Sequence, residues 1–444
     1  MGCGYLLPAR PREREIMKLE LTGLHEALTA PVSESMNFLN EIAHRFPDAI
    51  SLAAGRPFEG FFDPADVPRY FEIYRRHLTD RLDGDEAAVR RTLLQYGRTK
   101  GIIHELIAEH LRVDEGITAD PDALVVTVGC QEALWLTLRA LRRDERDVLL
   151  AVTPSYVGVH GAAMMVDMPV LPVREAADGI DPDDLVAVVR RARAAGRNPR
   201  ACYVIPDFAN PSGVRLDRAK RERLLDIAAA EDLLLLEDNP YGLFGDPAGP
   251  PTLKALDRHG QVVYLGSFAK TGLPGARVGY VLADQQVTGA PAGQPLLADQ
   301  LAKLKSMLTV NTSPIAQAVI GGKLLAHGHS LRAANARETE TYRGNLAQVL
   351  AGLERRFADL PSVRWNVPEG GFFLLLTVPF PAGDDLLAHC AAVHRVLWTP
   401  IHHFYADATQ RNVLRLSFSH LLPAEIEDGL DRLAEFIRAQ SAGN

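Results

Sequence analysis

The sequence predicts an α/β protein with a large domain built on a mainly parallel seven-stranded sheet and a smaller α+β domain. Seven short, continuous apolar runs lie between residues 124 and 282. Amphipathic segments of helical length separate most of these runs, and this alternation is typical of parallel strands covered by helices on both faces. After about residue 325 strands and helices mix in a different order, which indicates the second domain.

We divide the chain of 444 residues into four parts. Residues 1–18 are expected to be a disordered extension, and Met17 is an alternative natural start. Residues 19–63, with helical spacing and then a short strand, are expected to pack with the small domain or against a partner. Residues 64–325 are expected to form the large domain, and residues 326–444 are expected to form the small domain.

The predicted elements follow from apolar runs and from helical periodicity. The strands of the large domain are Leu124–Val128, Val148–Val152, Val170–Val173, Cys202–Ile205, Leu233–Leu236, Val262–Leu265 and Val278–Leu282, and its clearest helices are Gln131–Arg142, Asp183–Arg193 and Asp217–Glu231. The small domain is predicted to contain a long helix over 328–357, a strand pair at Val363–Val367 and Gly371–Thr377, a helix at Asp384–Val396, a strand at Val413–Phe418 and a last helix from Pro423 to Arg438.

Composition narrows the class of protein. A hydrophobic share of 47% and a charged share of 23% are ordinary for a globular domain. The net charge of -8 disfavours binding of nucleic acid, and no apolar run reaches the roughly 18–20 residues of a membrane span. The cysteines, which are Cys3, Cys130, Cys202 and Cys390, lack metal-ligand spacing. We therefore expect reduced thiols, a cytoplasmic location and no metal site.

One lysine stands out because of its position. Lys270 follows the buried strand Val262–Leu265, and a buried lysine is costly unless its charge is neutralised or used. A neutral amine can attack an aldehyde. Ser267 and Arg277 lie at offsets that suit a phosphate group near such an aldehyde. Pyridoxal 5′-phosphate carries both groups, although a lone strand-end lysine is more often part of an ion pair.

The wider context decides between these interpretations. The SxxK and PGxRxG pattern around Lys270 resembles the cofactor-lysine motif of the fold-type-I, pyridoxal-phosphate-dependent aminotransferases of classes I and II. This resemblance, which spans roughly residues 50–420, implies the fold type I transferase architecture and pyridoxal phosphate as the cofactor. It also implies that Lys270 is the catalytic residue and that Ser267 and Arg277 bind the phosphate.

Two further motifs follow the family's order. Asp238 ends a run of leucines, at the strand end where α/β sheets place ligand sites, and together with Tyr241 it resembles the family's D-x-x-Y motif. The resemblance implies that Asp238 binds the ring nitrogen and Tyr241 the 3-oxygen. Asn210 begins an Asn-Pro-Ser-Gly turn that matches the N-P-[TS]-G motif, which implies a second contact to the 3-oxygen. In isolation these motifs would be an ordinary helix cap and an ordinary turn.

The remaining cofactor contacts surround the phosphate and the ring. After Gly129, the N–H groups of Cys130 and Gln131 begin a helix and favour an anion. The family usually has a small hydroxyl residue where Cys130 stands, so we expect backbone rather than thiol contacts. Tyr156 resembles the residue that stacks on the ring. Tyr96 resembles the tyrosine that reaches the phosphate of the neighbouring subunit, which implies a homodimer with shared active sites.

Substrate contacts are predicted from both ends of the chain. Arg415, in an RLSF element, matches the arginine that binds the α-carboxylate, and the backbone of Gly55 would lie near the same group. Arg56 and Arg98 depart from the usual pattern and are either contacts to a polar substrate side chain or structural salt bridges. His402, next to a second histidine and to aromatics, is either part of an aromatic pocket or a surface residue. Metal binding there lacks a third ligand.

The resemblance implies ping-pong exchange of an amino group between an amino acid and a 2-oxo acid. The stretches MNFLNE, AGRPFE, LQYGRTKG and PDFANPSG resemble the hydroxyphenylglycine and 3,5-dihydroxyphenylglycine aminotransferases of peptide-antibiotic pathways, which favours aromatic or arylglycine substrates. The alternatives are a 2-aminoadipate, kynurenine-like or broad aromatic aminotransferase, or a pyridoxal-phosphate-dependent lyase or decarboxylase. A cofactor-binding sensor domain is the non-enzymatic alternative.

Overall fold

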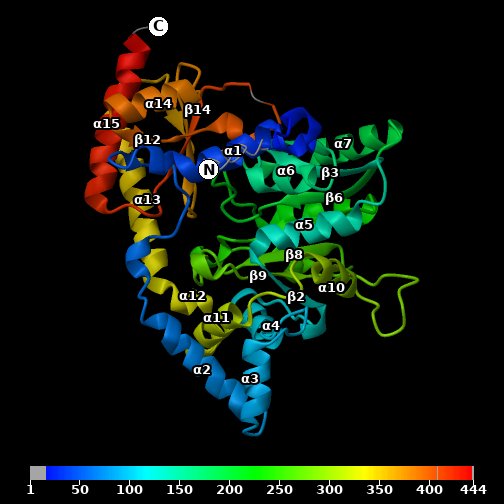
Figure 1. Ribbon diagram of the computed structural model, residues 1–444. Coiled ribbons are helices and arrows are strands. Elements are labelled where there is room, and N and C mark those ends of the chain that lie inside the picture. The colour runs from blue at the N-terminus through cyan, green and yellow to red at the C-terminus, as the bar shows by residue number, and fades with distance from the viewer. Residues whose placement is uncertain (1–16, 408, 443–444) are drawn as a thin grey trace, which may run out of the picture.

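The computed structural model describes residues 17–407 and 409–442 (Figure 1). Most of the predicted N-terminal extension, residues 1–16, lies outside the described residues, as do most side chains of the MNFLNE stretch. A large α/β domain and a smaller domain with α13, α14 and α15 lie side by side.

The large domain contains a mixed eight-stranded sheet in the order β2-β9-β8-β7-β6-β3-β4-β5. The central pairs from β8 to β4 are parallel, whereas β9 runs antiparallel to both β8 and β2. All seven predicted runs are strands. The eighth strand, β5, was not predicted, because its two residues are too few to show a periodicity. The strands are β2 (Leu124–Thr127), β3 (Asp147–Thr153), β4 (Val170–Ala176), β5 (Gly179–Ile180), β6 (Asn198–Val204), β7 (Leu234–Asp238), β8 (Val262–Ser267) and β9 (Gly279–Leu282).

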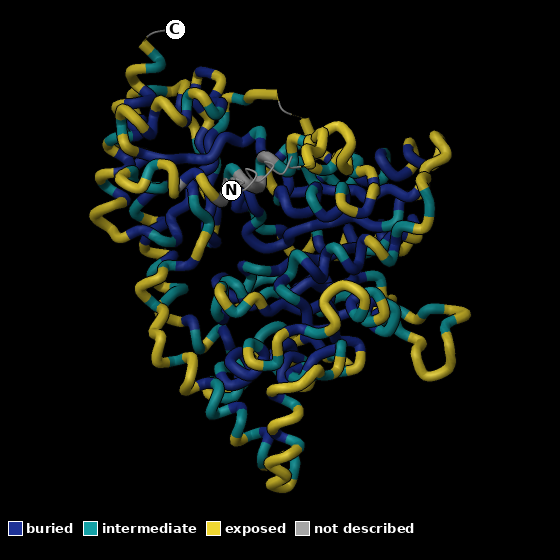
Figure 2. Tube along the Cα trace, viewed as in Figure 1, coloured by how far each residue is buried: buried dark blue, intermediate teal, exposed yellow. Residues whose placement is uncertain are grey.

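Helices cover both faces of this sheet, which is why the middle of its central strands is apolar at consecutive positions. Alternate residues of β7 show the division, because Leu236 belongs to the core under α5, α6 and α10 whereas Leu235 belongs to the core under α7 and α8. In Figure 2 the strands form the buried centre, and residues 288–295 project from the large domain as an exposed loop. The covering helices are α5 (Gly129–Leu141), α6 (Val157–Met164), α7 (Pro182–Ala194), α8 (Arg218–Ala230), α9 (Leu253–Leu256) and α10 (Leu297–Leu308).

A helical layer extends the large domain beyond β2 (Figure 1). Its helices α2 and α11 approach so closely that a Cβ at Gly322 would overlap the backbone of Tyr70. The layer contains α2 (Asp66–Arg81), α3 (Glu86–Leu94), α4 (His104–Glu115) and α11 (Pro314–Ala326). Short 3-10 helices occur at Leu21–Gly23, Glu26–Leu28, Glu59–Phe61, Pro121–Ala123, Gly242–Phe244 and Pro274–Ala276.

The small domain has an antiparallel sheet in the order β10-β11-β14-β13, packed against helices. The helix predicted over 328–357 is divided in two at Asn335, whose side chain donates hydrogen bonds to the carbonyls of Leu331 and Thr271. The elements are α12 (Leu331–Ala334), α13 (Ala336–Phe357), β10 (Arg364–Trp365), β11 (Phe373–Thr377), α14 (Asp384–Val393), β12 (Val396–Leu397), β13 (Thr399–Pro400), the 3-10 helix η7 (Ile401–Phe404), β14 (Val413–Ser417) and α15 (Pro423–Ala442).

The segment before the large domain contacts both domains. Helix α1 (Pro31–Arg45) packs against α6 of the large domain and against η7 of the small domain. The following strand β1 (Ile50–Ser51) pairs with β12, and Leu52 is buried in the core of the small domain. Within residues 19–63, for which helical spacing and then a short strand were predicted, the α-helix covers only residues 31–45, since Pro31 begins it. The four-part division of the chain remains a prediction.

Candidate active site

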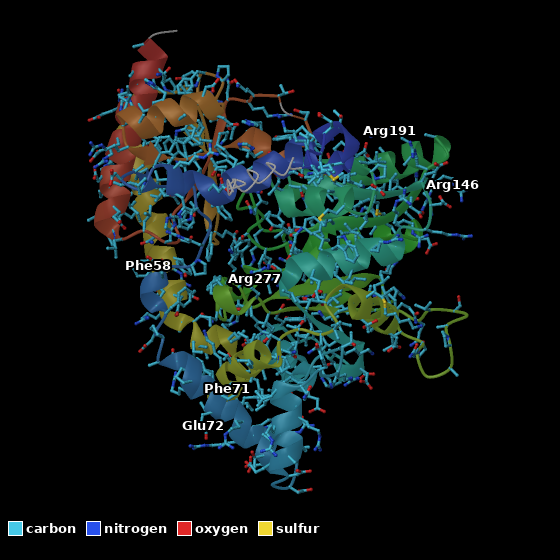
Figure 3. All side chains as sticks on the ribbon, viewed as in Figure 1. Phe58, Phe71, Glu72, Arg146, Arg191 and Arg277 are labelled. Atoms are coloured by element: carbon cyan, nitrogen blue, oxygen red, sulfur yellow. The ribbon has the colours of Figure 1, made fainter. Side chains whose placement is uncertain are left out.

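A cavity of about 270 Å³ opens where the C-terminal ends of the central strands meet the small domain. In Figure 3 Arg277 lies near the centre of the molecule, whereas Arg146 and Arg191 lie at its periphery. Ligand sites of α/β sheets occur at this end of the strands. The cavity brings together most of the predicted site residues, which are Gly55, Cys130, Gln131, Tyr156, Asn210, Asp238, Tyr241, Ser267, Lys270, Arg277 and Arg415.

Lys270 projects into this cavity from the turn that follows β8. Its Nζ donates a hydrogen bond to the carbonyl of Gly55 at 2.8 Å. Burial, followed by the nearby charges of Arg415 and Arg277, lowers the pKa of Lys270 to about 8. The amine is therefore far more often neutral near pH 8 than an exposed lysine, as a nucleophile or a proton acceptor requires.

Asp238 lies at the end of β7 and is held by two donors. The hydroxyl of Tyr203 donates to Oδ2 at 2.5 Å, and the thiol of Cys130 donates to Oδ1 at 3.5 Å. Burial raises the pKa of Asp238 to about 6, although both donors and Lys270 act in the opposite direction. Sequence analysis missed Tyr203. Its position in an otherwise apolar buried strand could have indicated this role, because a buried tyrosine hydroxyl needs a hydrogen-bond partner.

Cys130 also differs from its predicted role. We expected only its backbone to matter, yet its thiol contacts the Asp238 carboxylate. Burial and the neighbouring carboxylate raise the pKa of Cys130 well above its usual range, so the thiol stays protonated and acts as a donor. This environment is the opposite of the electropositive one that activates a nucleophilic cysteine.

An anion-binding corner forms at the N-terminus of α5. Gly129 has φ +73°, a conformation that favours glycine, and the absence of a Cβ leaves room for Nη2 of Arg277, which would lie 2.5 Å from a Cβ at this position. Arg277 itself has φ +51°. Within the described part of the chain no carboxylate forms an ion pair with Arg277. Helix N–H groups facing an arginine that has no protein counterion fit a phosphate.

A buried ion pair between Glu132 and Lys305 lies next to this anion-binding corner. Oε2 of Glu132 accepts a hydrogen bond from the N–H of Val128 at 2.6 Å and another from Nζ of Lys305 at 2.8 Å. The hydroxyl of Thr309 donates to Oε1 at 2.6 Å. Lys305 is fully buried. The pair fixes the backbone that leads into Gly129.

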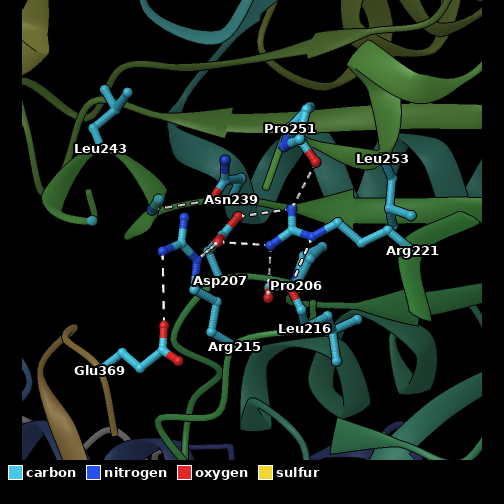
Figure 4. A network of polar contacts seen from close by, with 12 residues as sticks. Pro206, Asp207, Arg215, Leu216, Arg221, Asn239, Leu243, Pro251, Leu253 and Glu369 are labelled. Carbon is cyan, nitrogen blue, oxygen red and sulfur yellow. Dashed lines mark hydrogen bonds and ion pairs between the residues drawn. The ribbon is translucent and has the colours of Figure 1, made fainter. Parts of the chain in front are cut away.

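The loop that carries Asn210 is clamped by charged residues (Figure 4). Arg221, which is fully buried, donates to both carboxylate oxygens of Asp207 and to the carbonyls of Pro206, Leu216 and Pro251. Arg215 contacts Asp207 at 2.8 Å and lies 3.9 Å from Glu369 of the small domain. These contacts satisfy the buried charges and fix the loop that places Asn210 in the cavity. The sequence motif by itself did not reveal the clamp.

Arg415 reaches the cavity from β14. Its guanidinium lies over the rings of Phe373 at 4.3 Å and Phe404 at 4.8 Å, and it donates to Oδ1 of Asn210 at 2.8 Å. Burial lowers the pKa of Arg415 to about 10. Its Nε has no hydrogen-bond partner among the described residues. A buried guanidinium that contacts only neutral groups fits a ligand carboxylate.

The other wall of the cavity is aromatic. The hydroxyl of Tyr156 lies 3.5 Å from Oε1 of Gln131, whose amide donates to the carbonyl of Gly158 at 2.8 Å. Tyr241 packs against Phe372 and Phe373 with ring centroids 5.1 and 5.8 Å apart. The rings of Tyr156, Tyr241 and Phe373 line the cavity and offer flat surface to an aromatic ligand.

Four predicted residues do not line this cavity. Tyr96 is 86% exposed, and Arg56 is exposed as well. Arg98 forms a surface ion pair with Asp122 at 2.6 Å. His402 lies with His403 on another face, near Asp384. The expectation that the histidine pair lacks a third metal ligand is therefore wrong, because folding brings up Asp384 from 18 residues earlier in the chain.

The residues present fit pyridoxal phosphate. Lys270, with its lowered pKa, matches the aldehyde of the cofactor. The anion-binding corner at Gly129 and Arg277 matches the phosphate, and the buried carboxylate of Asp238 matches the ring nitrogen. Since Oδ1 of Asn210 already accepts from Arg415, its amide nitrogen is left to donate to the 3-oxygen.

Comparison with known proteins gives consistent matches. The family model described as "Aminotransferase class I and II" matches residues 76–433. The chain is 56% identical over 423 residues to an (S)-3,5-dihydroxyphenylglycine transaminase of Amycolatopsis orientalis, covering 95% of each chain. It is similar to the crystal structure of Pyrococcus horikoshii kynurenine aminotransferase (27% identity, TM-score 0.78, covering 94% of this chain and 97% of that one). It is also similar to an alpha-aminoadipate aminotransferase of Thermus thermophilus (27% identity, TM-score 0.77, covering 95% and 99%).

Proposed function

The chain belongs to the aminotransferase class I and II family, and we propose that its amino-acid substrate is an arylglycine, with (S)-3,5-dihydroxyphenylglycine as the first candidate. It is a pyridoxal-phosphate-dependent enzyme that exchanges an amino group between an amino acid and a 2-oxo acid. The main support for an arylglycine substrate is the 56% identity, across 95% of both chains, with the (S)-3,5-dihydroxyphenylglycine transaminase.

We assign the cofactor contacts to the residues around the cavity. Asp238 would hold the ring nitrogen, Asn210 and Tyr241 the 3-oxygen, and Tyr156 one face of the ring. The phosphate would be held by Ser267, Arg277 and the backbone N–H groups of Cys130 and Gln131. When bound, pyridoxal phosphate supplies an electron-withdrawing ring that acidifies the Cα–H bond of the substrate. The buried tyrosine and thiol donors to Asp238 support this assignment, since they orient its carboxylate.

In our proposal Lys270 moves the proton. With a pKa of about 8, its amine can accept the proton from the substrate Cα near neutral pH and give it up again. The carbonyl of Gly55 holds Nζ at 2.8 Å and so limits its freedom before the transfer.

Arg415 is proposed to bind the α-carboxylate of the substrate. An arylglycine carries its ring directly on Cα, so the ring must lie close to both Lys270 and Arg415. Phe373 and Phe404 flank the guanidinium and offer aromatic surface at this short distance. This arrangement supports a short, aromatic substrate over one with a long polar side chain.

We further propose that the enzyme is a homodimer and that Tyr96 completes the phosphate site of the partner. Exposed apolar side chains lie on two neighbouring segments, since Gly97 approaches the side chain of Asn311. They are Leu94, Tyr96, Met307, Leu308, Val310 and Ile315. An exposed apolar patch of this kind supports an interface between subunits.

We also propose a cytoplasmic location, which the free thiols Cys130, Cys202 and Cys390 support. Within residues 17–407 and 409–442, no helix is both long and apolar enough to span a membrane.

The test is a panel of amino donors with one acceptor, 2-oxoglutarate. The donors are (S)-3,5-dihydroxyphenylglycine, (S)-4-hydroxyphenylglycine, tyrosine, kynurenine and 2-aminoadipate, and the amino and oxo products are quantified by mass spectrometry. We expect the arylglycines to have the highest kcat/KM, by at least about tenfold, because only they place the ring at Cα. A higher kcat/KM for 2-aminoadipate or kynurenine would contradict the arylglycine assignment. Release of ammonia or carbon dioxide without any acceptor would favour a lyase or a decarboxylase.

A further inference from the structure

We propose that Asp384, His402 and His403 form a binding site for a divalent transition-metal ion on the small domain. The site lies where η7 meets the beginning of α14. It is separate from the cavity around Lys270, which none of these three residues lines. The proposal does not depend on the substrate assigned above.

The three side chains converge on one point. Nε2 of His403 lies 2.9 Å from Oδ1 of Asp384, and Nε2 of His402 lies 3.5 Å from the same oxygen. One ligand atom from each residue lies within 4.8 Å of the others. With zinc bonds of about 2.0–2.1 Å, neighbouring ligand atoms of a tetrahedral site are about 3.3 Å apart. The observed carboxylate-to-imidazole separations bracket that spacing, so a metal ion would need only small side-chain movements.

The ring of His403 is held in position on the side away from Asp384. Its Nδ1 hydrogen-bonds Oγ of Ser35 at 2.8 Å, and its ring stacks on Phe38 at 4.6 Å, both from helix α1. Metal-binding histidines usually have such an outer partner at the second ring nitrogen, because it fixes the orientation of the ring. The ring of His402 has no such outer partner, since its Nδ1 is buried and forms no hydrogen bond among the described residues.

The surroundings leave room and suitable charge for a cation. The three residues border a cavity of about 370 Å³, and the side chain of Asp384 is 46% exposed, so water can complete the coordination. Two further charged residues line the cavity and already have partners. Arg45 lies 3.9 Å from Glu41, and Asp407 lies 2.9 Å from Arg411. The carboxylate of Asp384 therefore provides the negative charge that faces the two imidazoles.

A metal ion at this position would connect three elements. Asp384 begins α14, the histidines belong to η7, and Ser35 extends the contact to α1. The next residue after the pair, Phe404, covers Arg415 in the active site. A bound metal would therefore stabilise the docking of α1 onto a segment that also shapes the substrate cavity.

The test uses the full chain without an affinity tag, loaded with cofactor, freed of excess cofactor and treated with a chelator. Zn²⁺ alone is titrated calorimetrically, and the melting temperature is measured with and without Zn²⁺. We expect one Zn²⁺ per chain and a rise in melting temperature of a few degrees, because a ligand that binds only the folded state stabilises it. Asp384→Asn and His402→Gln should each weaken Zn²⁺ binding at least about tenfold.

The matched control is His389→Gln/His394→Gln, which removes another neighbouring histidine pair of the small domain, with ring centroids 6.5 Å apart. This control should bind Zn²⁺ like the unaltered chain. If His403→Gln fails to fold because α1 loses its contact, the other two variants carry the test. Unchanged Zn²⁺ binding in Asp384→Asn and His402→Gln, or no saturable binding by the unaltered chain, would overturn the proposal and leave a purely hydrogen-bonded cluster.

Discussion

Arg415 of the small domain donates a hydrogen bond through Nη1 to Oδ1 of Asn210 in the large domain, at 2.8 Å. The bond joins residues 205 positions apart in the sequence. It links the residue proposed to bind the substrate carboxylate to the residue proposed to bind the cofactor. The two sites are therefore expected to act as one unit.

This relationship predicts energetic coupling. In Asn210→Ala the guanidinium loses one acceptor, so we expect kcat/KM to fall roughly 10- to 100-fold. Arg415→Lys should also reduce kcat/KM, because lysine cannot reproduce the two-pronged contact with a carboxylate. A double-mutant cycle on kcat/KM should give a coupling energy of about 1–2 kcal/mol. Strictly additive effects would show that the bond has no part in the reaction.

Lys270→Ala should abolish turnover. The variant lacks the amine that moves the substrate proton, so kcat should fall by at least about 10³-fold. Tm and circular dichroism check that the fold is intact. Lys303→Ala, a change at an exposed lysine of the same domain, is the matched control. Substantial activity in Lys270→Ala would remove Lys270 from the catalytic role.

The lowered pKa of Lys270 also predicts how the cofactor-free protein responds to pH. Unfolding restores a pKa near 10.5, so between pH 8 and 10.5 the unfolded chain binds more protons at this residue than the folded chain does. This site therefore makes folding less favourable below pH 8, and the cost disappears as the pH rises toward 10.5.

Lys270→Met should accordingly be more stable than the unaltered cofactor-free protein at pH 7, by an amount on the order of 3 kcal/mol. The difference in unfolding free energy, measured by urea denaturation, should shrink as the pH approaches 10. Lys303→Met is the control and should show no such trend. A difference that grows with pH would contradict a lowered pKa.

The described cysteines should resist alkylation in the folded protein. Burial raises the pKa of Cys202 and Cys390 to about 12, and burial beside Asp238 raises the pKa of Cys130 as well. Because the thiolate is the reactive form, iodoacetamide at pH 8 should label these three residues at least about 100-fold more slowly in the native state than in urea. Mass spectrometry of the peptides measures the rates. Rapid native labelling of Cys130 would contradict its contact with Asp238.

The buried pair of Lys305 and Glu132 should control cofactor affinity from a distance. Lys305→Met leaves the Glu132 carboxylate buried without its cation, which should cost about 3–5 kcal/mol of stability. It should also weaken cofactor binding, because Glu132 holds the N–H of Val128 next to the phosphate corner. Lys305→Met/Glu132→Gln should be less destabilised than the single variant. Unchanged cofactor affinity in Lys305→Met would show that the pair serves stability alone.

Much of the fold could be predicted because apolar runs are local signals. Leu233–Leu236 and Val262–Leu265 are continuously apolar and short, as strands buried on both faces are, and both predictions are confirmed. The division of the 328–357 helix could not be predicted, because it depends on a hydrogen bond from Asn335 to the distant Thr271. The two-residue strand β5 exists only through its pairing with β4.

The sequence alone identified the chemistry, because Lys270, Asp238, Asn210 and Arg415 lie in short motifs whose order along the chain is specific. Only the tertiary structure decided which other groups act on them. Tyr203 and Cys130 meet Asp238, Arg221 clamps the Asn210 loop, and Asp384 joins the histidine pair. These partners come from different strands and helices, and hydrogen bonds and pKa values depend on distance in space, which a linear order of residues does not specify.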